Sequence, residues 1–168
     1  MELSGPFLRG LTPPPLGHTM SNAPNKNRRS INEIIIHCSA SKPSTTRDDI
    51  RKWHKQRGWS DIGYHYVIES DGAIKTGRSI NKAGAHCKGF NEYSIGICLV
   101  GGDDGMKMHK FTAKQKAGLN TLIEGLFMSY GRLPITPHNA YNKHKTCPCV
   151  ELNEIIREGL LAGPAEED

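Results

Sequence analysis

Ile34-Ile35-Ile36-His37-Cys38-Ser39, at positions 34–39 of a 168-residue chain, is the stretch that decides the fold. Three β-branched residues in a row are typical of a strand that is buried on both faces of a sheet. A side chain at the end of such a strand is held rigidly and reaches the edge where clefts form. His37 is therefore a candidate functional residue, although a histidine with a purely structural role is the commoner case.

The residues that follow this strand predict further helices and strands. Thr46 with Asp49, and Thr112 with Gln115, have the spacing that caps the start of a helix. The expected strands are 34–36, 64–70, 73–76, 94–100 and 133–136, and the expected helices are 47–57, 112–130 and 150–161. We therefore expect an α/β (mixed α+β) fold, with a single domain and a central, mostly β-sheet of about five strands flanked by helices.

Composition divides the chain into one domain and two tails. Residues 1–30 are rich in Pro, Gly and Asn and lack periodicity, so we interpret them as a flexible N-terminal extension. Residues 31–162 are the expected domain, and residues 163–168 are a C-terminal tail. Met20 precedes a polar stretch that leads into the domain, so whether Met1 or Met20 is the native start is left open.

Charge and hydropathy limit the classes of partner. Lys and Arg outnumber Asp and Glu by 22 to 17, which favours an anionic partner such as cell wall or nucleic acid. Part of this excess comes from Lys26, Arg28 and Arg29, which we place in an exposed tail. No apolar stretch approaches the roughly 20 residues that span a bilayer. Arg9 and the Pro13-Pro14-Pro15 run interrupt any secretory signal, so we expect synthesis in the cytoplasm without a recognisable signal peptide.

Side chains that bind metals gather near the C-terminal end of the domain. Four of them lie within twelve residues, namely His138, His144, Cys147 and Cys149. Packing alone does not explain this density, and catalytic zinc takes three such ligands while leaving a fourth position for water. The spacing matches no standard structural zinc finger, and an odd total of five cysteines does not indicate a disulfide framework. The segment is therefore a candidate metal-binding loop.

Ordered blocks of sequence across the domain resemble one known family. They are Ile36–Ser41, Trp53-His54, Gly58-Trp59, Gly63–Tyr66, Gly84–Gly89 with Asn91, Ser94–Gly102 and Lys145–Pro148. From Ile34 to about Leu152 the chain resembles the zinc N-acetylmuramoyl-L-alanine amidases. It looks closest to the phage lysozyme type, and it is also similar to animal peptidoglycan recognition proteins.

The resemblance implies a role for particular residues of this chain. The implied ligands of Zn²⁺ are His37, His138 and Cys147. By the same resemblance, the residues that assist catalysis are Tyr64 and Lys145, and His86 lies in the substrate groove. Family members that only bind peptidoglycan typically lack the cysteine ligand, so the presence of Cys147 favours an enzyme.

Two departures from the family pattern leave alternatives open at the metal. The segment from His138 to Cys147 is one residue longer than the usual spacing, so His144 could replace His138. Cys149 stands where the family often has a small or aromatic residue, and it could compete for the metal or fill a gap. His138 is favoured because it follows the expected strand 133–136, where the family places its ligand.

The function implied by the resemblance is lysis of the bacterial cell wall by an endolysin of phage or prophage type. Such an enzyme hydrolyses the amide bond between N-acetylmuramic acid and L-alanine in peptidoglycan. It would act on the cell wall after release or export from the cytoplasm. Peptidoglycan is then the expected partner, and we expect a monomer.

Rival functions make different demands on the residues. A glycosidase would need a pair of carboxylates, but Asp48, Asp49, Asp61 and Asp71 are better explained as helix-start or turn residues. The second alternative is a peptidoglycan-recognition or RNA-polymerase-binding regulatory module, because some phage relatives bind an RNA polymerase. Arg28 and Arg29 would be its contact. Direct nucleic-acid binding is not expected, since basic and aromatic residues do not interleave along one element.

Overall fold

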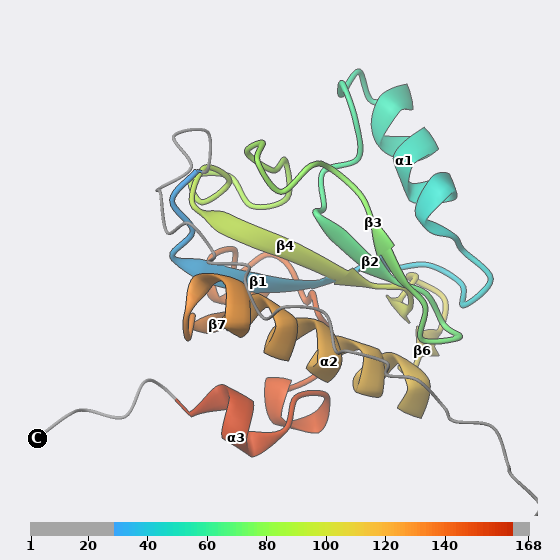
Figure 1. The fold of residues 1–168 in the computed structure, drawn as a ribbon. Helices are drawn as coiled ribbons and strands as arrows, with labels where there is room; N and C mark the ends of the chain where they lie inside the picture. The colour runs from blue at the N-terminus through green and yellow to red at the C-terminus, as the bar shows by residue number, and fades with distance from the viewer. Residues whose placement is uncertain (1–28, 163–168) are drawn as a thin grey trace, which may run out of the picture.

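The computed structural model describes residues 29–162, which contain a mixed five-stranded sheet. The order across the sheet is β3-β2-β4-β1-β7. The strands are β1 (Glu33–Cys38), β2 (Tyr66–Ile68), β3 (Ile74–Thr76), β4 (Ser94–Leu99) and β7 (Ile135–Pro137). Only β3 runs antiparallel to its neighbour (Figure 1). The predicted α/β class and five-stranded sheet are confirmed, while residues 1–28 of the expected extension and the tail 163–168 lie outside the described part of the chain.

Strand β1 occupies the interior of the sheet, as its run of three isoleucines predicts. It pairs in parallel with β4 on one side and β7 on the other, and all six of its residues are buried. Side chains alternate between the two faces of a strand. Ile34, Ile36 and Cys38 join the core beneath α2, so Ile35 and His37 face the opposite side.

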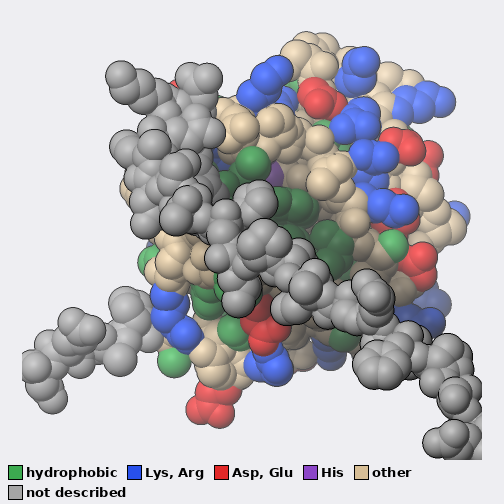
Figure 2. All heavy atoms as spheres, in the orientation of Figure 1, with side chains coloured by type: hydrophobic (Ala, Val, Ile, Leu, Met, Phe, Trp, Pro, Cys, Tyr) green, Lys and Arg blue, Asp and Glu red, His purple; other side chains and the backbone are tan. Residues whose placement is uncertain are grey.

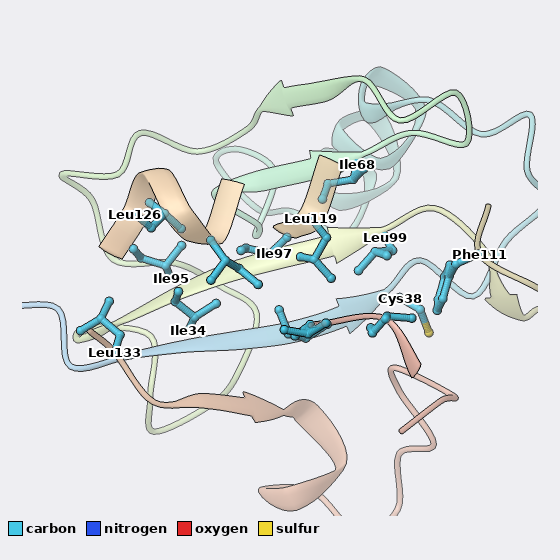
Figure 3. Packing of buried hydrophobic residues seen from close by; sticks show 14 residues of the cluster. Ile34, Cys38, Ile68, Ile95, Ile97, Leu99, Phe111, Leu119, Leu126 and Leu133 are labelled. Carbon is cyan, nitrogen blue, oxygen red and sulfur yellow. The ribbon is translucent and has the colours of Figure 1, made fainter. Parts of the chain in front are cut away.

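One face of the sheet is covered by α2 (Ala113–Tyr130), which begins at the predicted cap Thr112 with its partner Gln115. Leu119 and Ile123 are fully buried and Leu126 nearly so, against isoleucines of β1 and β4 (Figure 3). The short α3 (Glu158–Leu161) packs on α2 (Figure 1). Among the described residues, no helix combines the length and apolarity needed to cross a membrane.

The other face carries α1 (Arg47–Gln56), whose start at Thr46 is capped through Asp49 as predicted. Ile50 packs with Cys98 and other residues in a second, smaller core cluster. Trp53, three positions after Ile50, is 38% exposed, whereas His54 is buried. Over α1, Lys and Arg side chains are interspersed with Asp and Glu (Figure 2).

The C-terminal helix expected over 150–161 is wrong as a single element. The chain forms a 3-10 turn, η2 (Leu152–Glu154), and then α3 after a break. The Asn120 side chain in α2 donates to Ile155 O at 3.0 Å and accepts from Arg157 N at 2.8 Å. A side chain of another element thus takes hydrogen bonds that a continuous helix would make internally. A small hairpin of β5 (Gly102–Asp103) and β6 (Met108–His109) was also not predicted.

Arg29 corrects the interpretation of the basic tail. Its guanidinium donates to four backbone carbonyl oxygens, those of Ile80, Asn91, Glu92 and Ser94. The placement of Arg29 in an exposed tail is therefore wrong, because its side chain is bound to the domain. The physical reason is that a guanidinium offers five N–H donors, and four carbonyl oxygens between Ile80 and Ser94 lie within hydrogen-bond distance of it. Lys26 and Arg28 lie outside the described residues.

Replacing Ile123 in α2 by alanine is expected to lower the free energy of unfolding by about 2–5 kcal/mol, because the side chain is fully buried and leaves a cavity. Chemical denaturation of the two proteins measures the difference. Thr121→Ala, at an exposed position of the same helix, is the control and should change stability by no more than about 0.5 kcal/mol. Equal losses for the two variants would contradict the packing of α2 on the sheet.

Candidate metal centre

Three potential metal ligands converge at the carboxyl end of the parallel strands. The ligand atoms of His37, His138 and Cys147 all lie within 4.8 Å of one another, the one such group found among residues 29–162. His37 is the penultimate residue of β1, and His138 opens η1 (His138–Ala140) directly after β7. Because Ile36 is paired with Pro137, the next residues on each strand stand side by side, and the two imidazole rings are 4.5 Å apart. Open α/β sheets bind their ligands at this end of the strands.

Cys147 returns to this edge through a loop that is tied at both ends. Asn139 N donates to Cys147 O at 2.9 Å, which joins the end of the loop to η1. The Cys147 sulfur accepts a hydrogen bond from Cys38 N at 3.0 Å. This contact fixes the position of the Cys147 sulfur relative to the end of β1. The end of β1 thus supplies one potential ligand, His37, and orients a second, Cys147.

A relay of hydrogen bonds determines which nitrogen of His37 is free. The Ser94 hydroxyl donates to Phe90 O at 2.7 Å, so its oxygen accepts from His86 Nε2 at 3.2 Å. His86 Nδ1 is then unprotonated and accepts from His37 Nε2 at 2.9 Å. The lone pair of His37 Nδ1 is consequently the one available to a metal. A buried partner that holds the second nitrogen of a ligand histidine is the usual way to set its orientation.

His86 occupies a space that glycines leave open. A Cβ on Gly96 would lie 2.6 Å from the His86 ring, and one on Gly84 would lie 2.4 Å from it. Asn91 Oδ1 also accepts from the backbone nitrogen of His86 at 2.8 Å, which holds this loop in place. His86 is 9% exposed and both ring nitrogens have protein partners. Its assignment to substrate binding stays a prediction, and its contacts place it behind His37.

The histidines of the centre are held in their neutral form. Burial, with the charges of His86 and His138, lowers the pKa of His37 well below its usual value. Burial and the Lys145 charge lower the pKa of His138 as well. Metals bind neutral imidazole, so both rings are ready ligands at neutral pH. Two imidazoles and one thiol make a donor set that suits a transition-metal ion.

Tyr64 and Lys145 lie near the two histidines of this group, Tyr64 near His37 and Lys145 near His138. The Tyr64 ring lies 5.1 Å from the His37 ring, between centroids. Burial, aided by the nearby Cys98 and Cys147 thiols, raises the pKa of Tyr64 well above its usual value, so the phenol stays protonated and can donate a hydrogen bond. Lys145 is exposed, lines a surface pocket with Asn139, and lies near enough to His138 to lower its pKa.

The remaining candidates lie outside the three-residue group. His144 is exposed, and its backbone nitrogen donates to the side chain of Asn142. The Cys149 sulfur contacts Cys38 Sγ at 3.5 Å. Of the two histidines left open by the lengthened loop, the structure thus brings His138 to His37 and Cys147.

Two supporting contacts were missed by sequence reasoning. Ser94 is the first residue of the family block Ser94–Gly102. A hydroxyl at the start of an apolar strand needs a hydrogen-bond partner when it is buried, and this position was the signal that could have indicated its contact. The hydrogen bond from Cys38 N to the Cys147 sulfur joins residues 109 positions apart, so no local sequence pattern predicts it.

Comparisons with known proteins agree with this geometry. The N-acetylmuramoyl-L-alanine amidase family matches residues 27–150. The endolysin of Escherichia phage T7 is 40% identical over 147 residues, which cover 82% of this chain and 97% of that protein. The amidase LysC from Clostridium intestinale superposes with a TM-score of 0.68 at 32% identity, covering 77% of this chain and 84% of that one. Drosophila PGRP-LB gives a TM-score of 0.68 at 28% identity, covering 83% and 88%. The chain belongs to the N-acetylmuramoyl-L-alanine amidase family.

Proposed function

We propose that this chain is a zinc-dependent amidase that hydrolyses the bond between N-acetylmuramic acid and L-alanine in bacterial peptidoglycan. The observation that carries the proposal is the complete donor set of His37, His138 and Cys147 at the strand ends. Two histidines and a cysteine are a known ligand set of catalytic zinc, with a fourth position left for water or substrate. The amidase and endolysin relatives supply the substrate class.

The residues around the donor set fit the needs of amide hydrolysis. A zinc ion held by the three ligands supplies Lewis acidity, which activates water and polarises a carbonyl oxygen. Negative charge develops on that carbonyl oxygen as the amide is attacked, and preorganised donors stabilise it. The protonated Tyr64 phenol offers such a donor, and the Lys145 ammonium offers positive charge. The relay through His86 keeps the His37 ring in one orientation during turnover.

A glycosidase receives no support from the described carboxylates, because those considered are engaged in local structure. Asp49 caps the start of α1. Asp61 accepts from Arg51 Nε at 2.8 Å, and Asp71 accepts from Ala73 N at 2.9 Å. A glycosidase requires two carboxylates that face each other across a sugar.

The site of action follows from the relatives, among which are several phage endolysins. We propose that the chain acts on the cell wall in the same way. No observation on the described residues favours an RNA-polymerase-binding module, because the guanidinium of Arg29 is already bound to four backbone carbonyls.

Cys147→Ser is expected to remove both zinc and cell-wall lysis, because a serine hydroxyl is a poor replacement for a thiolate ligand. Zinc content and the release of new amino-terminal alanine from purified sacculi measure the two losses. Cys87→Ser, at a cysteine outside the donor set, should keep both. The proposal would be refuted by a zinc-free Cys147→Ser protein that still releases amino-terminal alanine. It would also be refuted if the unmodified protein released new reducing sugar from sacculi.

Tyr64→Phe and Lys145→Ala are each expected to lower kcat by about 100- to 1,000-fold while leaving the zinc content unchanged, since each removes one stabilising group from the developing oxyanion. Steady-state kinetics on soluble peptidoglycan fragments give the ratio. Lys143→Ala, an exposed lysine of the same loop, serves as the matched control for charge. Near-normal turnover of both test variants would remove these residues from the mechanism.

Ser94→Ala is expected to weaken zinc binding by about 10- to 100-fold, because His86 Nε2 loses its acceptor and no longer directs the His37 proton away from the metal. Competition with a chromogenic chelator measures the affinity. Ser129→Ala, at an exposed serine of α2, should bind zinc as the unmodified chain does. Wild-type zinc affinity in the Ser94 variant would show that the relay does not orient His37.

A further inference from the structure

Two thiols outside the metal donor set are in contact at the end of β1. The sulfur atoms of Cys38 and Cys149 are 3.5 Å apart, although the residues are separated by 111 positions. Cys38 belongs to the core cluster beneath α2, where Figure 3 shows it near Phe111. We propose that Cys38 and Cys149 are an oxidation site that forms an intramolecular disulfide when the protein meets a small-molecule disulfide.

The backbone holds this pair together from both sides. Cys38 is fixed by pairing of β1 with β4, opposite Leu99, and is 5% exposed. Cys149 adopts a left-handed conformation with φ of 69°, and its backbone nitrogen donates to Thr146 O at 2.7 Å. A non-glycine residue rarely adopts this conformation, and here it turns the sulfur of Cys149 toward Cys38. The two thiols therefore meet through backbone geometry.

Gly102 leaves the space that the pair occupies. A Cβ at this position would lie 2.7 Å from the Cys38 sulfur and 3.5 Å from the Cys149 sulfur. A disulfide needs the sulfurs to approach from 3.5 Å to roughly 2.0 Å, a movement of about 1.5 Å. Rotation of the half-buried Cys149 side chain can supply this shift while Cys38 stays in the sheet.

An oxidant can reach the two thiols from the side of Cys149, and this determines which thiol reacts first. Cys149 lines a surface pocket together with Lys143, Lys145 and Thr146, whereas Cys38 lies behind it. A small oxidant therefore reaches Cys149 first. The buried Cys38 is in contact with the sulfur that has reacted, as a resolving thiol must be.

The reaction is ordinary thiol–disulfide exchange and balances with glutathione disulfide as the oxidant. The Cys149 sulfur attacks one sulfur of glutathione disulfide, which forms a mixed disulfide and releases one glutathione that takes up the Cys149 proton. The Cys38 sulfur then attacks the Cys149 sulfur and releases the second glutathione, which takes up the Cys38 proton. Two protein thiols are oxidised to one disulfide, and one glutathione disulfide is reduced to two thiols.

The competing partner, Cys147, is engaged elsewhere. Its sulfur accepts from Cys38 N at 3.0 Å and belongs to the group of three potential metal ligands. The bridge would tie β1 to the chain two residues beyond Cys147 and so restrain the metal-binding loop. Disulfides persist outside the reducing cytosol, so the dithiol form belongs to the cytoplasm and the bridged form to an oxidising cell envelope.

The test treats the zinc-loaded, full-length protein with glutathione disulfide and maps its peptides without reduction. The expected result is the loss of two of the five thiols, a peptide pair joined through Cys38 and Cys149, and retained zinc. Five thiols that stay reduced, glutathione left on Cys149, or a bridge that includes Cys147, Cys87 or Cys98 would each overturn the proposal. Zinc measured before oxidation keeps this result separate from any failure of the proposed amidase function.

Two variants make the assignment specific. Cys149→Ser should lose no pair of thiols on oxidation, while Cys87→Ser should form the same bridge as the unmodified chain. The rate of zinc transfer to a chelator is the second readout. Oxidation should slow this transfer in the unmodified chain and leave it unchanged in Cys149→Ser. Equal rates for the oxidised and reduced unmodified chain would refute the restraint on the loop.

Discussion

The parallel pairing of β1 with β7 is the constraint on which the candidate metal centre depends. Ile36 stands opposite Pro137, so the residues that follow them, His37 and His138, emerge together at the carboxyl edge of the sheet. A shift of one residue in β1 would turn His37 toward the α2 core, because side chains alternate along a strand. The register of β1 is in turn fixed by the polar residues on either side of its three isoleucines, because a slip by one residue would carry Glu33 or His37 into the apolar core beneath α2. The hydrophobic core and the metal centre are thus two consequences of one pairing.

A chain of hydrogen bonds behind His37 fixes the orientation of its imidazole ring. The hydrogen bonds from His37 through His86 and Ser94 to Phe90 O run in one direction only, because each donor has a single proton to give. This direction leaves one nitrogen of His37 for a metal. The relay fits only because Gly96, in the middle of β4, has no side chain where the His86 ring lies. Glycine is unfavourable inside a strand, and its presence at position 96 is explained by the His86 ring that it accommodates.

The last two residues of β1 point to opposite faces of the sheet. His37 faces the donor set, while the next residue, Cys38, points into the core beneath α2 and touches Cys149. The backbone between them also donates to the Cys147 sulfur. Chemistry on the two faces is thereby connected through a rigid strand, and a covalent bond at Cys149 would act on the loop that carries Cys147. This arrangement explains how a loop without regular structure can hold the Cys147 sulfur in a defined place.

The sequence by itself determined the elements whose stabilising contacts are local. The caps at Thr46 and Thr112 were predictable because each bond joins residues three positions apart, and β1 because three β-branched residues suit a buried strand. The matched motifs also pointed to the family. Only the tertiary structure brought His138, and not His144, beside His37 and Cys147, and placed Arg29 on the domain. It also interrupted the last helix through the Asn120 side chain and brought Cys38 into contact with Cys149. Each of these outcomes joins residues about 35 or more positions apart. Such contacts depend on strand register and on the path of loops, which no short-range pattern of residues encodes.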